Sequence, residues 1–396
     1  MKYLVWRNWL SAAAVVAVLG ACSGTPEPDY AELQTFDEQV TPSIAWRARV
    51  GSGSDEYFSR LRPAYSDGVL YAADRQGQIA AFNAENGDRL WRTSIAPDKP
   101  FSLFSVFRKG PPARISGGLV VAANGLYLGT ENGDIYALDK ESGEVLWHRQ
   151  VPGEVLAEPA VGDGFVIAHL GDGSVIALDA RDGSQRWLHE EDVPTLSLRG
   201  TSAPVIETGG VLVGTNSGRA IVLILENGQL AWDERIVTPT GSSDLERMVD
   251  IDATPVIRGD TAYMLGYNGE LVALELRTGE TIWKRDYSGY RTPQVTSTRI
   301  FVTDSNSHVI GLDRLNGNER WRNDQLYNRS LTEATVMPRH VVAGDRFGYL
   351  HWFDRDDGQI VGRMELRNES VQVAPVRAGD YLIVQTVRGR ILAIQQ

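Results

Sequence analysis

The histidines and the acidic turn residues are the groups in this sequence that could bind a metal ion or transfer protons. No two of the six histidines stand at the spacing of a metal-binding pair, so we interpret them as structural or surface residues. They are His148, His169, His189, His308, His340 and His351. Four aspartates suggest calcium, but they recur at one position of a repeated motif, and a unique ion site would not recur. They are Asp139, Asp179, Asp313 and Asp354.

The sequence also lacks the motifs of the common catalytic and nucleotide sites. It has no G-x-x-x-x-G-K-[ST] phosphate loop, no H-E-x-x-H zinc motif and no G-x-S-x-G nucleophile turn. The net charge of −12, from 39 basic and 51 acidic residues, and the lack of a basic stripe argue against nucleic acid as a partner. We therefore predict no catalytic residue, no metal site and no cofactor.

Cys22 predicts a covalent modification. Lys2 and Arg7 precede an apolar run over residues 9–19, which has the length of a secretory signal and is short for a membrane span. The run Leu19-Gly-Ala-Cys22 resembles a bacterial lipobox, which implies cleavage before Cys22 and lipidation of its thiol. The alternative is an ordinary signal peptide with a chance cysteine. As the only Cys in the chain, Cys22 also excludes internal disulfides.

The N-terminal region predicts a lipid anchor and a linker ahead of the folded part. Several acyl chains on one residue anchor a protein stably, since each buried CH₂ contributes about 0.8 kcal/mol. Ser23 follows the Cys where Asp would favour the inner membrane, so we expect the periplasmic face of the outer membrane. The predicted division is a signal peptide over 1–21, lipidated Cys22 with a flexible tether over 22–41, and one folded domain over 42–396.

A fifteen-residue unit, typified by residues 133–147, recurs along the chain. It begins with a turn residue, and a Trp stands fourteen residues later in the first six of eight copies. The turn residues are Gly77, Gly133, Gly173, Gly218, Gly269, Ser307, Gly348 and Gly389, and the tryptophans are Trp91, Trp147, Trp187, Trp232, Trp283 and Trp321. The seventh copy has Gly362 in place of Trp, from which we expect a looser unit. A Pro precedes most of the turn residues by fourteen positions, where a first strand would begin.

Each copy predicts four short strands, and eight copies predict a ring of small sheets. Asn132-Gly133 indicates a tight hairpin, and Asp139 with Gly143 indicates a second turn before the strand that carries Trp147. Eight sheets packed radially spread the core over eight interfaces, so a chain of 396 residues escapes the limit of about 250–300 residues for a single core. We expect the Trp to fill the space between neighbouring sheets.

The two ends of the chain predict how this ring closes. Ile44-Ala45-Trp46-Arg47 has the pattern of a fourth strand without the three strands that should precede it, and the last copy stops short of its Trp. We therefore predict an all-β fold: an eight-bladed β-propeller of four-stranded antiparallel blades, closed by an N-terminal strand that completes the last blade.

The connections between one copy's Trp and the next copy's Pro vary in length, and all of them should emerge on one face of the disc. Loops on a rigid scaffold tolerate insertion, so we expect function on that face. The longest connection, over 94–113, carries an apolar cluster of Phe101, Leu103, Phe104, Val106 and Phe107, and we interpret it as a flap folded over the blades beneath it.

Two further connections join consecutive blades and should be neighbours on that face. In the first, Leu196 and Leu198 alternate with polar residues before Arg199, which suits either local packing or an apolar groove of a partner. In the second, Asp250 and Asp252 precede a first strand, where their carboxylates could simply accept hydrogen bonds from backbone amides.

The repeat consensus, G-x-[IL]-x-A-L-D-x-x-[ST]-G-x-x-x-W, resembles that of pyrroloquinoline-quinone enzymes and of their non-enzymatic relatives. Within that group the chain resembles the lipoprotein family of the outer-membrane β-barrel assembly machinery, over about residues 43–396. Four features carry this resemblance: the lipobox, the eight units, Leu-Ser-Leu-Arg-Gly at 196–200, and Arg247-Met-Val-Asp-Ile-Asp-Ala-Thr-Pro255.

The resemblance implies a non-catalytic scaffold that binds the periplasmic POTRA domains of BamA and, through it, the other subunits of the machinery. Such a scaffold assists the folding and insertion of outer-membrane proteins, and contact with unfolded clients is a further hypothesis. The resemblance also implies that Leu196, Leu198, Arg199, Asp250 and Asp252 form or support the docking surface. The leucines would supply buried apolar area, and Arg199 would supply directional hydrogen bonds.

Two other functions fit the same fold. A pyrroloquinoline-quinone-dependent dehydrogenase would need a cofactor, a calcium site and a base, and it commonly carries a vicinal Cys pair that this chain lacks. A periplasmic propeller that binds sugar or peptidoglycan would show saturable binding independent of the loop around Arg199.

Overall fold

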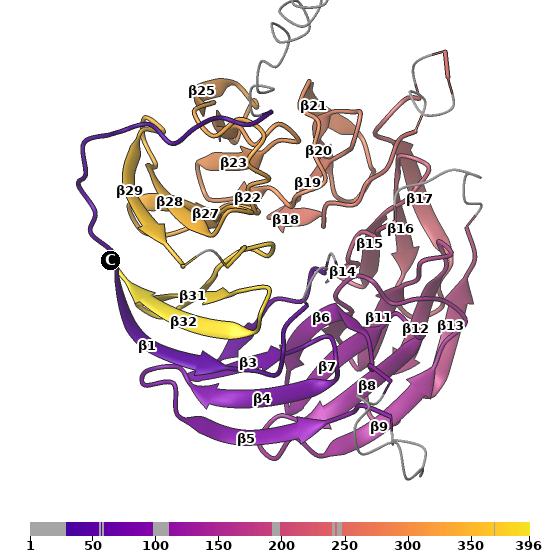
Figure 1. The fold of residues 1–396 in the computed structure, drawn as a ribbon. Coiled ribbons are helices and arrows are strands. Elements are labelled where there is room, and N and C mark those ends of the chain that lie inside the picture. Colours follow the sequence, from indigo (N-terminus) through magenta and orange to yellow (C-terminus); the bar gives the residue numbers. More distant parts are fainter. Residues whose placement is uncertain are drawn as a thin grey trace, which may run out of the picture.

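Figure 1 shows the computed structural model, whose described residues are 29–54, 57, 59–97, 111–191, 199–239, 242–243, 248–367 and 369–396. Cys22, Leu196, Leu198 and most of the apolar connection 94–113 lie outside these ranges. The regular structure in the described ranges is β-strand, and they contain no helix long and apolar enough to cross a membrane.

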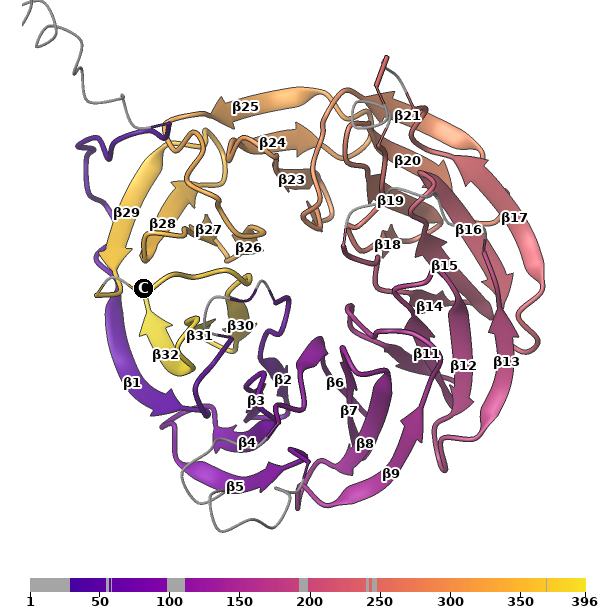
Figure 2. The same cartoon turned by 45° about the vertical axis from the view of Figure 1, so that its right-hand side comes forward.

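The strands form eight four-stranded antiparallel sheets arranged around a central axis (Figure 2). Blades 1 to 4 are β2 (Ala64–Ser66), β3 (Val69–Ala73), β4 (Gln78–Asn83), β5 (Arg89–Ser94); β6 (Ile115–Ala122), β7 (Gly125–Thr130), β8 (Asp134–Asp139), β9 (Val145–Gln150); β10 (Ala160–Gly162), β11 (Phe165–His169), β12 (Val175–Asp179), β13 (Gln185–His189); and β14 (Val205–Glu207), β15 (Gly210–Gly214), β16 (Arg219–Ile224), β17 (Leu230–Arg235). The eight-bladed propeller predicted from the repeat is confirmed.

The second half of the ring repeats the same order, except that its last blade takes its outer strand from the N-terminal end. Blades 5 to 8 are β18 (Val256–Arg258), β19 (Thr261–Leu265), β20 (Leu271–Glu275), β21 (Thr281–Arg285); β22 (Gln294–Val295), β23 (Arg299–Thr303), β24 (Val309–Asp313), β25 (Glu319–Asn323); β26 (Thr335–Val336), β27 (His340–Gly344), β28 (Tyr349–Asp354), β29 (Ile360–Glu365); and β30 (Val376–Ala378), β31 (Tyr381–Gln385), β32 (Arg390–Gln395) with β1 (Ser43–Arg49). Strand β1 pairs antiparallel with β32, from Ser43 opposite Gln395 to Arg49 opposite Arg390, as the ends of the chain predict.

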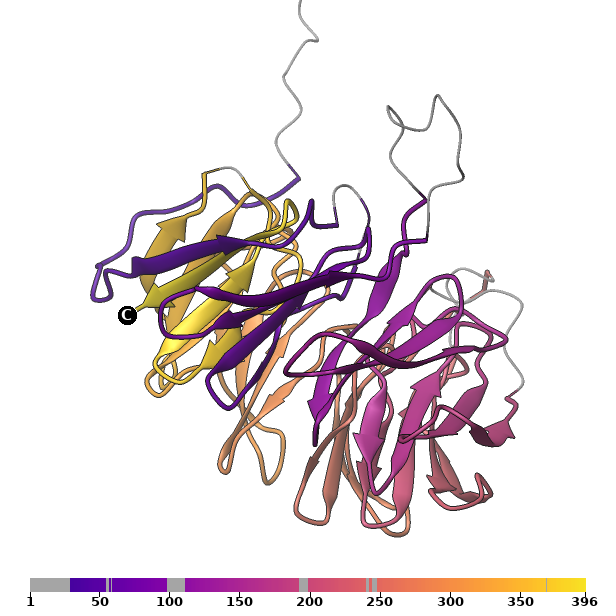
Figure 3. The same ribbon diagram turned by 90° about the horizontal axis from the view of Figure 1, so that it is seen from below.

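Burial follows the position of each strand within its blade. The two middle strands of blade 3, β11 and β12, are buried on both faces and read as continuous apolar runs, whereas the outer strand β13 exposes most of its residues. Both faces of a middle strand are covered because each blade packs against a blade on either side. In Figure 3 the ring is turned by 90° from the view of Figure 1.

The constant spacing between the turn and the Trp is explained by contacts between neighbouring blades. Trp147 of blade 2 donates its indole N–H to the backbone oxygen of Ala180 in blade 3, at 3.0 Å. Its ring lies against Gly183 in the same turn, where a Cβ atom would stand 2.6 Å from the ring. Such a Trp–Gly pair occurs at seven blade interfaces: Trp46–Gly87, Trp91–Gly143, Trp147–Gly183, Trp187–Gly228, Trp232–Gly279, Trp283–Gly317 and Trp321–Gly358. The predicted role of the Trp in filling the space between blades is confirmed. The Gly of the neighbouring blade makes room for the Trp ring.

At the eighth interface, between blades 7 and 8, the N-terminal segment takes part in the packing. Gly362 occupies the Trp position, and the backbone N–H groups of Gln39 and Val40 both bond to the oxygen of Val361 at 2.9 Å. Val40 and Trp352 of β28 are buried in the same cluster. A ring from a middle strand and an added segment thus pack where the other blades have their Trp, and a cavity of about 580 Å³ remains beside Val40 at this interface. The looser seventh blade stays a prediction.

Residues 29–42 include the last part of the segment that the sequence predicts to be a flexible tether. In the structure they lie along blade 7 (Figure 1, indigo). The Arg329 guanidinium donates to the oxygen of Ala31 at 3.0 Å, and Arg363 donates to that of Gln34 at 3.0 Å. Leu33 and Phe36 pack against the core of the interface between blades 6 and 7. The segment ahead of β1 is thus held by backbone and side-chain contacts from Asp29 onward.

Candidate functional site

Arg199 stands on the face where the blades connect, and its guanidinium joins a turn of blade 2 and the connection between blades 2 and 3. Its Nη2 atom lies 3.2 Å from Oε2 of Glu131 and 3.1 Å from Oε1 of Glu154. Glu131 belongs to the turn between β7 and β8, and Glu154 to the connection between blades 2 and 3. The two carboxylates fix the position of the Arg199 side chain, yet 61% of it remains exposed to solvent.

A second guanidinium holds Glu131 from the other side. Arg75, in the turn between β3 and β4, donates from Nε and Nη2 to the two oxygens of Glu131, each at 3.0 Å. The ring of Tyr57 lies 3.9 Å from the Arg75 guanidinium carbon. Burial opposes ionisation of Glu131, but the hydrogen bonds and charges of Arg75 and Arg199 keep its pKa below the ordinary value. The carboxylate therefore stays charged and fixes Arg199.

Asp252 lies beside the residue that follows Arg199. A Cβ atom on Gly200 would stand 2.3 Å from Oδ1 of Asp252, so a larger residue there would have to displace the Asp252 carboxylate. Arg60 pairs with Asp252 Oδ2 at 3.2 Å and donates to the backbone oxygens of Asp252 at 2.8 Å and Thr201 at 3.3 Å. Burial raises the pKa of Asp252, and the Arg60 charge acts in the opposite direction. The two connections are neighbours, as the sequence predicts.

Asp250 is enclosed by the loop that carries it. The residue is 0% exposed, and Asp252 is 5% exposed. Asp250 forms an isolated bridge with Tyr267, whose backbone N–H donates to the backbone oxygen of Asp250 at 2.8 Å. Among the described candidates, Arg199 is thus exposed, while Asp250 and Asp252 are buried.

Two residues that support this site were missed at the sequence level. Arg60 comes from the connection between β1 and β2, and nothing in its local sequence points to a partner at position 252. His169 ends β11, and its Nδ1 atom lies 3.0 Å from the backbone oxygen of Ser202, in a buried position that lowers its pKa. The sequence offers one indication of this role. His169 stands at the end of a middle strand, where the strand meets the face of the disc.

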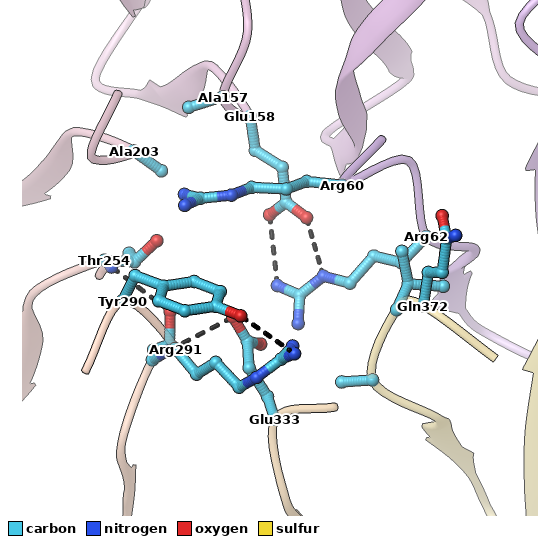
Figure 4. Close-up of a pocket in the computed structure, with 13 residues that line it drawn as sticks. Arg60, Arg62, Ala157, Glu158, Ala203, Thr254, Tyr290, Arg291, Glu333 and Gln372 are labelled. Atoms are coloured by element: carbon cyan, nitrogen blue, oxygen red, sulfur yellow. Dashed lines mark hydrogen bonds and ion pairs between the residues drawn. The ribbon is translucent and has the colours of Figure 1, made fainter. Parts of the chain in front are cut away.

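Charged side chains also line the centre of the ring (Figure 4). Arg62 donates from Nε and Nη2 to the carboxylate of Glu158 at 2.6 and 3.1 Å, and the charge of Glu158 raises the pKa of Arg62. Arg291 donates to the hydroxyl of Tyr290 at 3.3 Å. The cavity between these residues has a volume of about 50 Å³.

Metal-binding side chains do not gather in the part of the chain that the structure describes. No three His, Cys, Asp or Glu residues there come close enough together to hold a metal ion. The aspartates that recur in the repeat bond to backbone N–H groups of their own turns, as Asp139 Oδ1 does with Glu141 at 3.0 Å and Ser142 at 2.8 Å. These hydrogen bonds stabilise the turn, which is the structural role that the recurrence of the aspartates predicts.

Solved structures share the architecture of this chain, which is of the class of eight-bladed β-propellers. BamB from Moraxella catarrhalis superposes with a TM-score of 0.78 at 22% identity, covering 90% of this chain and 100% of that one. A quinohemoprotein alcohol dehydrogenase from Comamonas testosteroni has a TM-score of 0.69 at 12% identity, covering 92% and 78%. At these identities the likeness shows the fold alone, which enzymes and non-enzymes share.

Sequence similarity identifies the family within that class. The family model described as outer membrane protein assembly factor BamB matches residues 4–102 and 96–323. BamB of Alteromonas naphthalenivorans is 43% identical over 97% of this chain and 95% of its own length. BamB of Escherichia coli strain K12 is 38% identical over 96% of both chains. The chain therefore belongs to the BamB family of outer membrane protein assembly factors.

Proposed function

We propose that this chain is a non-catalytic scaffold of the outer-membrane β-barrel assembly machinery and that its connection face docks the periplasmic POTRA domains of BamA. Family membership supports the assembly role, because its relatives are named as assembly factors. Through BamA the disc would meet the other subunits and assist the folding and insertion of outer-membrane proteins. The observation that carries the docking surface is the geometry of Arg199.

Arg199 combines exposure with a fixed position. A carboxylate from a turn of blade 2 and one from the connection between blades 2 and 3 hold its guanidinium, and Arg75 holds the first of them in turn. A donor group positioned in this way loses little conformational entropy when it binds, which favours it as an anchor for a partner's carboxylate or carbonyl group. Leu196 and Leu198 lie within three positions before it in the sequence and would add apolar area to the same contact.

Asp250 and Asp252 would act on this surface indirectly. Both are buried, so their role in docking would be to shape the loops that present Arg199. Arg60 supports the same loops by binding the carboxylate and the backbone oxygen of Asp252. Substitution of Asp252 would leave the Arg60 charge uncompensated, so the loops would shift and docking should weaken. Substitution of Asp250 should weaken docking by shifting the loop that carries Asp250.

We further propose that lipidated Cys22 attaches the disc to the outer membrane on its periplasmic side. Cleavage before Cys22 would leave the signal peptide, residues 1–21, behind. If residues 1–22 are replaced by an ordinary cleavable secretory signal, we expect the protein to appear in the soluble periplasmic fraction. The unchanged protein should fractionate with outer-membrane vesicles, and equal distribution of the two would contradict the anchor.

Photocrosslinking in intact cells tests the docking surface. A photoreactive amino acid at position 199 should crosslink to BamA. The matched control is position 181, because Arg181 is 82% exposed and lies in the turn between β12 and β13, on the opposite face. Reproducible absence of a product at position 199, with products elsewhere on the disc, would refute the assignment.

A charge reversal gives a quantitative prediction. Arg199→Glu places a third carboxylate beside Glu131 and Glu154, so we expect at least about a tenfold loss of BamA copurification, since loss of an anchor costs about 1.4 kcal/mol or more. Arg181→Glu should leave copurification unchanged. Each variant removes an ion pair and places a glutamate beside a largely buried carboxylate, Glu131 in one and Asp179 in the other, so we expect a similar modest loss of stability in both. Thermal unfolding checks that the two losses match.

A further inference from the structure

An apolar groove opens between blades 4 and 5 on the face opposite Arg199. Its walls include the Thr208–Gly209 turn between β14 and β15 and the Leu276–Arg277 turn between β20 and β21. Such turns lie on the other side of the disc from the connections between blades, because the strands of a blade alternate in direction. The groove has a volume of about 560 Å³, within the range of about 300–1,000 Å³ for ligand sites.

At the groove, blade 4 lacks an aromatic ring that six other blades supply. In blades 1, 2, 5 and 6 a ring from the second strand lies 5.9–6.1 Å from the Trp of the outer strand. In blades 3 and 8, Phe165 and Tyr381 enter the corresponding clusters. The rings that meet the Trp in the first group are Tyr71, Tyr127, Tyr263 and Phe301.

In blade 4 the two positions that carry these rings are Gly210 and Leu212. Cross-strand pairing aligns Leu212 with Val222, and Val222 with Trp232, where blades 1, 2 and 5 have a Tyr–Ala–Trp row. Within the described residues, Trp232 is the only aromatic side chain of its cluster. Leu212, Val222, Trp232, Ile257 and Leu276 all border the groove.

Blade 7 shows what this fold does when a ring is missing. Its outer strand has Gly362 in place of Trp, and the extended segment that contains Val40 lies against that position. A Cβ atom on Gly362 would stand 2.8 Å from the backbone oxygen of Val40. No described segment of the chain lies in this way against Trp232 of blade 4. A cavity of about 580 Å³ remains beside Val40, so the added segment narrows the space at blade 7 without closing it.

The rim of the groove is acidic. Glu207, Asp260 and Glu275 border it together with a single basic residue, Arg277. A hydrogen bond from Thr278 lowers the pKa of Glu275, so this carboxylate stays ionised at neutral pH. Three carboxylates against one guanidinium favour an occupant with positive charge beside its apolar part.

We propose that this groove binds an aromatic side chain of an extended protein segment that carries Lys or Arg next to it. The aromatic ring would lie beside Trp232 as Tyr71 lies beside Trp91, with ring centres about 6 Å apart. The adjacent basic group would meet Glu207 and Asp260. This site is separate from the surface around Arg199, so each can fail without the other.

A double substitution that restores the missing ring tests the proposal. Leu212→Tyr with Val222→Ala recreates the Tyr–Ala–Trp row of blades 1, 2 and 5 and should fill the groove. The probe is a blocked Lys-Phe-Lys peptide whose Phe carries a 4-fluoro label. It is titrated with the folded protein, and binding is followed by fluorine NMR. We expect binding to the wild type and a loss of affinity of about tenfold or more in the double variant. Unchanged affinity in the folded variant would overturn the proposal.

A second variant keeps the test independent of repacking in the core. Glu207→Gln with Asp260→Asn changes two exposed rim residues and should weaken binding of the Lys-Phe-Lys probe by about threefold at low salt, with no effect on a Ser-Phe-Ser probe. Equal binding of Lys-Phe-Lys and Glu-Phe-Glu probes would overturn the charge assignment.

Other occupants of the groove give distinct results. A second copy of the chain would appear as self-association in sedimentation that the Leu212→Tyr, Val222→Ala variant abolishes, and this would overturn the proposed external segment. Free phenol or indole that binds as tightly as the peptide would show a small-molecule pocket and would equally overturn it.

Discussion

At the scale of single residues, the turn glycines have two functions. Gly183 has φ of +70°, a conformation that L side chains rarely adopt, and it also supports the ring of Trp147. Gly164, in the turn between β10 and β11, has φ of +83°, and a Cβ atom added there would meet no atom within 4 Å beyond its chain neighbours. Gly164 is therefore required for its backbone conformation alone, whereas Gly183 is required for both its conformation and its contact with Trp147.

Substitution of these glycines predicts different losses of stability. Gly164→Ala should lower the free energy of unfolding by about 1 kcal/mol, the cost of a positive φ. Gly183→Ala should lower it by a further 1–3 kcal/mol or so, because the new Cβ would overlap Trp147. Urea unfolding measures both, and equal losses would show that the Trp ring adjusts freely.

The hairpin turn of the repeat differs from the turn that the sequence predicts. Gly133 has φ of +79°, but Asn132 does not have a positive φ, so the pair does not form a two-residue type I′ turn. Instead the Thr130 hydroxyl accepts hydrogen bonds from the N–H groups of Asn132 at 3.2 Å and Asp134 at 3.1 Å. The preference of Gly for positive φ fixed the turn position, while the side chain of Thr130 decided its form.

At the scale of elements, the segment before β1 contributes to stability. It enters the sheet edge of blade 7 through two backbone hydrogen bonds to Val361, and it buries Val40 in the cluster that contains Trp352. Its polar, Pro-containing sequence suggests a flexible linker, because the apolar residues in it are few and widely spaced. Their burial depends on the surface of a blade that is encoded about 300 residues later.

A pair of alanine substitutions measures this contribution. Val40→Ala should lower the free energy of unfolding by about 1–2 kcal/mol, because it removes buried methyl groups between blades 7 and 8. Gln39→Ala should change it by less than about 0.5 kcal/mol, since the Gln39 side chain is exposed and its backbone bond is kept. Similar losses in both variants would contradict a packing role for Val40.

At the scale of the whole molecule, the ring depends on a contact between the chain ends. Strand β1 completes the last blade, and Trp46 on it donates to the oxygen of Ala84 in blade 1 at 3.0 Å. Without β1 the sheet of blade 8 would expose an unpaired edge at β32, and the first and last blades would lose a shared Trp.

Relocating the strand tests this closure. A chain that begins at Gly51 should unfold at lower urea concentration and aggregate. If residues 43–49 are appended after Gln396 through a short turn, β1 can pair with β32 as a fourth strand does in other blades, and we expect most of the lost stability to return. Sedimentation and urea unfolding check both chains, and failure of the appended strand to restore a monomer would contradict closure by β1 alone.

The sequence by itself determined the number of blades, the order of their strands, the Trp between blades and the closing strand. These features repeat at fixed short spacing, so turn chemistry and strand alternation are enough to reveal them. The tertiary structure decided which distant residues meet: Arg60 at Asp252, Val40 at Gly362, and Arg199 between Glu131 and Glu154. Each of these contacts joins different blades or connections. Local sequence does not encode them, because they depend on how the completed ring brings loops and segments together.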